Sequence, residues 1–231
     1  MTEPIGMSPA LRKLLVSYAD KMVADGRSEG WYQGLYEGRR EGRRAGLLKG
    51  KRNALERQLK RKFGPLTEDT RSQVRALSSP KEVDPYLDRV LDADSLAAMS
   101  LGSAGLVSSS VRRKRMLKRK RKALGWGAEL KENAREESWI KGRKHGHRVG
   151  AHLGFAQGKR QALVRQVTAT FGRRVRKTVI LLSGRWSLRE LDRYLDRVLS
   201  ANSVEEMDFR EPSVPPIYEE FFNGSPVTRW P

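Results

Sequence analysis

Apolar positions recur at helical spacing along much of the chain. Near the N-terminus they return every three or four residues behind Ser8-Pro9, a capping residue followed by proline in the first helical position. Later stretches with Leu55 and Leu59, and with Leu163 and Val167, repeat this spacing. We therefore expect amphipathic helices in these regions.

Local signals predict where the helices end and restart. The first long helix should stop at Phe63-Gly64-Pro65, since glycine followed by proline terminates helices. Two short helices are expected after it, near Glu68–Leu77 and Val83–Leu91, and Ser79 is a candidate N-cap for the second.

The chain also repeats itself. Residues 26–99 align with residues 134–207 at a constant offset of 108 without a gap, and 30 of the 74 positions are identical. The sequence YLDRVL occurs at 86–91 and again at 194–199. Such an alignment predicts a tandem duplication.

One segment conflicts with a purely helical fold. Val175–Leu182 has the β-branched content of a strand, whereas its counterpart Thr67–Val74 is polar and compatible with a helix. Because duplicated sequences should share a backbone, we expect both segments to be helical and the protein to be all-α.

We expect the chain to divide into five parts: an N-terminal helix (1–25), repeat copy one (26–99), a Ser-rich linker and basic segment (100–133), repeat copy two (134–207) and a Pro-rich tail (208–231). The tail is expected to be either disordered or a docking peptide.

Glycine recurs at every fourth position, a pattern that we call the glycine ladder. It runs from Gly26 to Gly50 in copy one and from Gly142 to Gly158 in copy two. Each glycine inside a helix costs about 1 kcal/mol relative to alanine, so another interaction must offset the loss. A groove of small residues allows a second helix to approach closely. The predicted packing positions are Gly34, Gly38, Gly42, Gly46, Gly146, Gly150 and Gly154.

A period of four drifts by about 40° per step around an ideal helix. We therefore expect only three or four glycines to face one partner, and the end positions Gly26 and Gly50 to be turned away. The partner helix could belong to this chain or to another. The alternative is a disordered segment rich in arginine and glycine, and the arginines between the glycines argue against a dimer inside a membrane.

The sequence resembles a known family at three places: an EGRREG-type glycine ladder, RKFGPLTEDT (61–70) and YLDRVLDADSL (86–96). They resemble the C-terminal domain of unknown function in the recombination-promoting nuclease (putative transposase) proteins of bacteria. Copy two is less similar, since Arg173 replaces Pro65. The family's nuclease domain has no counterpart here, so the resemblance implies an accessory or oligomerising module and gives no reason to assign nuclease activity.

Charge narrows the choice of partners. The 231 residues contain 47 Lys and Arg against 27 Asp and Glu, a net charge of +20, and there is no cysteine. Nine of the twelve residues of Val111–Lys122, here called the basic segment, are Lys or Arg. Such a run favours phosphate backbones, DNA or RNA, without reading bases; a solvated charge run, an acidic protein and a membrane surface are the alternatives. The predicted contact residues are Arg112, Arg113, Lys114, Arg115, Lys118, Arg119, Lys120, Arg121 and Lys122, with Arg39, Arg40, Arg43 and Arg44 of the ladder.

No pattern predicts catalysis, a metal site or a cofactor. His145, His147 and His152 lie close in sequence but lack a carboxylate that would complete a ligand set. The repeated carboxylates Asp84, Asp88, Asp192 and Asp196 are expected on salt-bridged solvent faces, through i,i+3 pairs such as Arg189–Asp192 and Arg193–Asp196.

The favoured interpretation is a non-enzymatic, nucleic-acid-binding helical repeat protein. The first alternative is an adaptor or scaffold that pairs with itself or a partner protein through the glycine ladder, and the second is an accessory subunit of a nuclease or transposase. No segment is apolar enough to cross a bilayer. We expect a cytoplasmic protein associated with the nucleoid or with ribonucleoprotein, or a nuclear one in a eukaryote.

Overall fold

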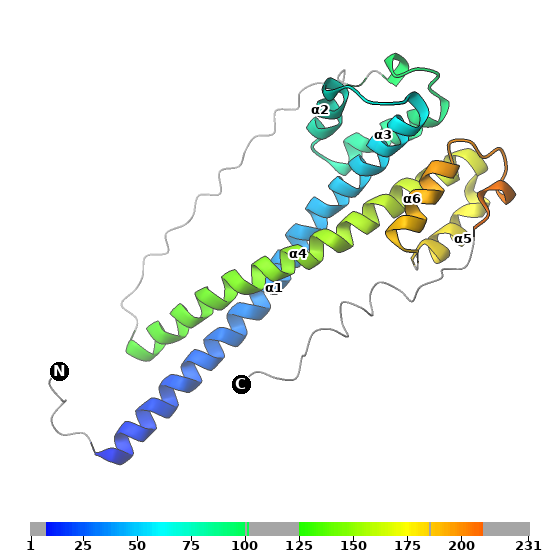
Figure 1. Ribbon diagram of the computed structural model, residues 1–231. Coiled ribbons are helices and arrows are strands. Elements are labelled where there is room, and N and C mark those ends of the chain that lie inside the picture. Colours follow the sequence, from blue (N-terminus) through cyan, green and yellow to red (C-terminus); the bar gives the residue numbers. More distant parts are fainter. Residues whose placement is uncertain (1–7, 100, 102–124, 185, 210–231) are drawn as a thin grey trace. The chain divides into compact units, whose positions relative to one another are not determined.

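The computed structural model describes residues 8–99, 101, 125–184 and 186–209. Within these ranges it contains six α-helices and two 3₁₀ helices and no strand (Figure 1). The predicted all-α class is confirmed. The helices are α1 (Pro9–Phe63), α2 (Glu68–Ala76), α3 (Pro80–Asp92), η1 (Ala97–Met99), α4 (Trp126–Phe171), α5 (Arg173–Ser183), α6 (Leu188–Arg197) and η2 (Glu205–Met207).

The ends of the two long helices follow the local signals. Helix α1 begins directly after Ser8, whose hydroxyl accepts a 3.3 Å hydrogen bond from the backbone N–H of Leu11. It passes residue 25 without interruption and ends before Gly64, which has a φ of 85°. Helix α4 ends before Gly172, which also has a φ of 85°. Glycine suits these two stops because it adopts positive φ without steric cost.

Side chains cap the N-termini of the short helices α2, α3 and α6, as expected for α3. The Ser79 hydroxyl accepts a hydrogen bond from the backbone N–H of Glu82, and Thr67 caps α2 in the same way. At α6, Ser187 and Glu190 form a complete capping box. Local sequence therefore determines where these elements begin.

The segment with strand-like composition is helical. Helix α5 contains Val175–Leu182, and the prediction for this segment is confirmed. Its Val179 side chain is fully buried in the hydrophobic core. Burial of one face against the core outweighs the weak intrinsic strand preference of its β-branched residues.

The chain divides into two compact units. The first combines Met1–Arg44 with Ser110–His152, and the second combines Ala45–Ser109 with Leu153–Pro231. Each unit therefore takes residues from both sequence copies. The basic segment and the tail from residue 210 lie outside the described residues.

In its described residues, the first unit consists of the N-terminal parts of α1 and α4. Their glycines contact each other's backbones at successive turns in the same order along both helices, so the two segments run parallel.

The second unit contains the hydrophobic core. In it the short helices α2 and α3 follow the end of α1, and α5 and α6 follow the end of α4 (Figure 1). The side chains of Leu55, Leu59, Leu163 and Val167 are fully buried, as their helical spacing indicates. The core also takes in side chains from α3, from α6 and from the C-cap of α6: Val83, Leu87, Val90, Leu191, Tyr194, Leu195 and Val198.

Candidate nucleic-acid interface

The glycine ladder of α1 packs directly on the backbone of α4. A Cβ built on Gly34 would lie 2.2 Å from the carbonyl oxygen of Trp139, and one on Gly42 would lie 2.2 Å from that of His147. No side chain fits at such distances, so only glycine permits this approach. The disordered alternative does not hold for these residues, and the partner helix belongs to the same chain.

The contacts are reciprocal between the two helices. Glycines of α1 meet carbonyls 105 residues further along the chain, and glycines of α4 meet carbonyls 111 residues earlier, as Gly142 meets Trp31. These two separations lie symmetrically about the sequence offset of 108. Gly38, Gly146 and Gly150 make equivalent contacts, and Gly46 and Gly154 are buried.

The expectation for the ends of the ladder is wrong. A Cβ on Gly26 would lie 2.2 Å from the carbonyl oxygen of Lys131, and one on Gly50 would lie 2.2 Å from that of Phe155. The drift of about 40° per step turns these positions away only from a straight partner. A partner helix that winds around α1 along the row of glycines keeps contact with all of them. Because the glycine spacing of four residues exceeds the helical period of 3.6, this winding must be right-handed.

A ladder of polar contacts follows one edge of the helix pair in the first unit. Glu29, Gln33, Glu37 and Glu41 of α1 each bond to a residue 102 positions further on. The Nζ of Lys131 donates to Glu29 at 2.6 Å, and a guanidinium nitrogen of Arg143 donates to Glu41 at 2.8 Å. The Lys131 ammonium lowers the pKa of Glu29 chiefly through this hydrogen bond. The carboxylates on this edge are therefore matched by cations or donors of the partner helix.

The opposite edge has fewer carboxylates. Trp31 and His145 there align with Trp139 and Glu37 of the first edge, and their ring centroids lie 5.8 Å apart.

All three histidines, His145, His147 and His152, are exposed. Within the described residues no group of three histidine or acidic side chains is placed to hold a metal ion.

Four exposed cations lie on the outer faces of the pair. Arg40 and Arg44 each follow a ladder glycine by two residues, about 200° around α1 from the helix contact. Lys144 and Arg148 hold the same positions on α4. In the part of the chain that the structure describes, these four side chains form no ion pair.

The other two predicted arginines on α1 are placed differently. Arg39 is half-buried and Arg43 is exposed, and both interact with neighbouring groups. The structure thus groups Arg40 with Arg44 on one face and leaves Arg39 and Arg43 towards an edge. The remaining predicted contact residues belong to the basic segment, which lies outside the described residues.

The repeated carboxylates are paired, but with other partners than expected. Asp84 accepts from the Nζ of Lys51 at 2.5 Å, and Asp192 accepts from that of Lys159 at 2.6 Å. The expected pairs of Asp192 with Arg189 and of Asp196 with Arg193 do not occur among the described residues. Lysine and arginine side chains of α1 and α4 bind the aspartates of α3 and α6. These ion pairs form in place of the expected i,i+3 pairs.

Two further ion pairs connect the copies in the second unit. Arg57 of copy one binds Asp196 of copy two through two hydrogen bonds of 2.8 and 2.7 Å. Arg165, which aligns with Arg57, binds Asp88, which aligns with Asp196. The hydrogen bonds to Asp196 raise the pKa of Arg57. These carboxylates act as structural counter-ions.

Buried amides meet at the same place. Gln58 and Gln166 are fully buried, and each donates its Nε2 to the other's Oε1, at 2.6 and 2.8 Å. Each Nε2 also donates to a backbone carbonyl of the opposite copy, Leu195 for Gln58 and Leu87 for Gln166. The two glutamines align in the sequence repeat, but no local pattern predicts that their side chains meet.

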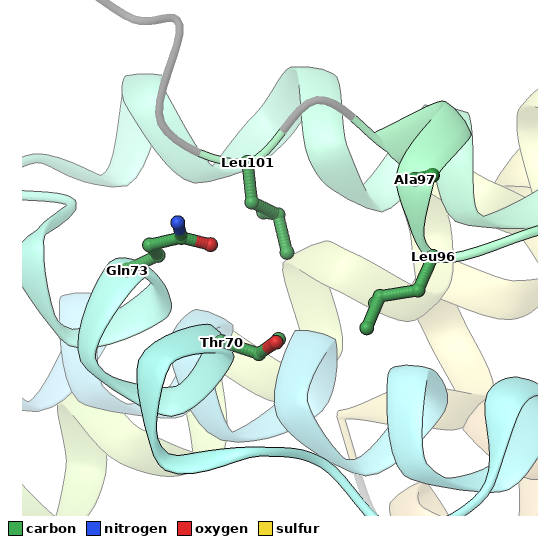
Figure 2. A pocket seen from close by; sticks show the side chains of 5 residues that line it. All are labelled: Thr70, Gln73, Leu96, Ala97 and Leu101. Carbon is green, nitrogen blue, oxygen red and sulfur yellow. The ribbon is translucent and has the colours of Figure 1, made fainter.

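The second unit also has a small surface pocket of about 370 Å³. Figure 2 shows the side chains that line it, Thr70, Gln73, Leu96, Ala97 and Leu101. The lining contains no charged group, and none of its residues is a base that could activate the Thr70 hydroxyl as a nucleophile. This pocket therefore provides no candidate active site.

Comparisons with protein-family models, with curated proteins and with solved structures found no match for the chain. None of the helices in the described ranges is both long and apolar enough to cross a membrane.

Proposed function

We propose that this chain is a non-enzymatic nucleic-acid-binding protein that contacts phosphate backbones through its basic segment and the exposed arginines of the ladder helices. The observation that carries the proposal is the uncompensated positive charge: the net charge is +20, and nine of twelve residues in the basic segment are cationic. Phosphate backbones gain affinity from such clusters by releasing counter-ions.

The distribution of charge in the first unit supports this proposal. Glu29 and Glu41 are engaged along one edge of the helix pair, and the outer faces carry Arg40, Arg44, Lys144 and Arg148 without ion pairs among the described residues. Cations on two outer faces suit a backbone-directed contact better than base reading, which needs a few donors converging in one groove.

We further propose that the fold is a tandem duplication in which the two copies pair as two subunits of a symmetric dimer would. Each supporting contact occurs twice, once at each set of aligned positions. Arg57–Asp196 is matched by Arg165–Asp88, and Lys51–Asp84 is matched by Lys159–Asp192. Gln58 and Gln166 lie where the two copies meet.

The adaptor alternative is less well supported. It requires the glycine faces to be available to another protein, whereas the glycines of α1 lie against α4. A partner helix would have to displace this contact first. No separate observation favours the accessory-subunit alternative.

Two sets of substitutions test the proposed binding surface. The first replaces Arg119, Lys120, Arg121 and Lys122 with Ala, and the second replaces Arg40 and Arg44. Binding to two unrelated DNA duplexes and one RNA is measured by fluorescence anisotropy at several salt concentrations. We expect both variants to weaken binding to all three nucleic acids about equally. The slope of log affinity against log salt should become shallower by up to about one unit for each phosphate contact that is lost.

A control with Ala at Arg12 and Lys13 removes the same charge as the second set from an exposed site at the start of α1. We expect it to change binding less than the Arg40 and Arg44 variant. Unchanged affinity and slope in both test variants would overturn the proposed surface. Loss of binding for one sequence alone would show base reading instead.

A further inference from the structure

Helix α5 in the second unit exposes apolar side chains. Val179 and Ser183 face the core and are buried, but Ile180 is 47% exposed and Leu181 is 75% exposed. On a helical projection both lie on the solvent face. The aligned residues of copy one, Ser72 and Gln73, are polar, so this apolar surface belongs to copy two alone.

The same face is strongly basic at its N-terminal half. Arg173, Arg174, Arg176 and Lys177 are exposed and form no ion pair within the described residues. The first turn has no acidic residue, and the N-cap Gly172 provides no side-chain hydrogen bond. Cations are unfavourable near a helix N-terminus because of the helix dipole. Copy one has the opposite arrangement, with an acidic first turn and a Thr67 cap in α2.

A segment that fits this face would combine carboxylates with apolar side chains. Residues 217–222 have this composition, with the sequence Ile-Tyr-Glu-Glu-Phe-Phe, and they lie outside the described residues. Opposite charge and matching apolar content make the segment complementary to the exposed face of α5.

The connection to this segment is long enough to reach α5. Phe209, at the end of the described chain, stacks on Trp186 with ring centroids 5.5 Å apart, and Trp186 follows three residues after Ser183, the last residue of α5. The eight residues from Phe209 to Ile217 can span roughly 26 Å when extended. The 11 residues of α5 extend over only about 16 Å.

We propose that residues 217–222 dock on the exposed face of α5 in the same chain. Ile180 and Leu181 receive the apolar side chains of the segment, and the cations of the first turns receive Glu219 and Glu220. The contact covers an exposed apolar surface and provides α5 with the acidic partner that its own first turn lacks. This interaction is separate from the proposed nucleic-acid binding.

Disulfide trapping in the full chain tests the docking directly, because the chain has no cysteine of its own. The test variant carries Thr178→Cys and Asn223→Cys, which leaves Ile180, Leu181 and the whole docking segment intact. The first control moves one cysteine to α2, as Gln73→Cys with Asn223→Cys. The second control adds Glu219→Lys and Glu220→Lys to the test variant. Far-UV circular dichroism verifies that all three are folded.

We expect the intramolecular disulfide to form about tenfold or more faster in the test variant than in either control, since docking raises the effective concentration of the two thiols. Equal rates in the test variant and the Gln73→Cys control would overturn the proposal, and so would a rate unaffected by the two lysines. Disulfides formed mainly between chains would overturn it as well, because the segment would then dock on a second copy.

Discussion

Gly42 has a neighbour where its side chain would be. A Cβ at this position would lie 2.2 Å from the carbonyl oxygen of His147 and 2.7 Å from the backbone nitrogen of Ala151. Both atoms are backbone atoms of α4, so no rotamer change relieves the overlap. The helix propensity lost at glycine is offset by dispersion contacts along the closely packed backbones.

Alanine substitutions measure this effect at single residues. Gly42→Ala and Gly26→Ala should each lower the melting temperature, because overpacking typically costs about 1–3 kcal/mol and the propensity gain is at most about 1 kcal/mol. The measurement is thermal unfolding followed by circular dichroism.

Gly184→Ala is the matched control. Gly184 has a φ of −58° at the end of α5, and the nearest atom to its added Cβ is 3.5 Å away. This variant should be neutral or slightly stabilising. A Gly42→Ala protein that melts at a higher temperature would show that the helices do not pack closely at this site.

Among the elements, α3 depends on its N-terminal cap. The carboxylate of Glu82 accepts hydrogen bonds from the Ser78 backbone N–H at 2.7 Å and from the hydroxyls of Ser78 and Ser79 at 2.9 Å. The bond from the Ser78 backbone makes the largest contribution to lowering the pKa of Glu82 below its ordinary value. A carboxyl group with a lowered pKa stabilises the fold above its unfolded-state pKa.

The cap therefore makes the stability of the second unit dependent on pH. Wild type should be more stable than Glu82→Gln near neutral pH, and the difference should disappear as the pH falls through the lowered pKa of Glu82. Urea midpoints measured by circular dichroism between about pH 2 and pH 7 check this, in a range that extends well below the ordinary glutamate pKa of about 4.3. Glu136→Gln, at an exposed carboxylate of α4, is the control. A wild-type advantage that persists unchanged at the acid end would mean that the carboxylate is not responsible.

Features that depend on contacts between residues close in sequence could be predicted, whereas features that depend on contacts between distant residues could not. Ser8-Pro9, Phe63-Gly64 and Ser79 mark helix ends through contacts within four residues, so the sequence alone locates them. The partners of Asp192 and Asp196 are Lys159 and Arg57, 33 and 139 residues away, whereas local i,i+3 spacing predicts Arg189 and Arg193. Such pairs depend on how α1 and α4 come together, which local patterns do not specify.

For the whole molecule, the reciprocal contacts connect the sequence repeat to the packing. Gln58 and Gln166, 108 residues apart, form a buried amide pair, and the glycines of α1 and α4 contact each other's backbones in one register within each unit. The winding of the two helices could not be predicted from an ideal straight helix, which is why Gly26 was expected to face away. The charge that this packing leaves exposed on α1 and α4 supports the proposed function, together with the basic segment.

The most direct test of that function is the salt dependence of nucleic-acid binding by the intact chain. Affinities for two duplexes of unrelated sequence are measured between about 50 mM and 200 mM salt, where a protein making several phosphate contacts loses roughly a thousandfold or more in affinity. We predict two parallel lines with the same steep negative slope. Affinity that does not respond to salt, or that is confined to one of the two sequences, would contradict backbone-directed binding.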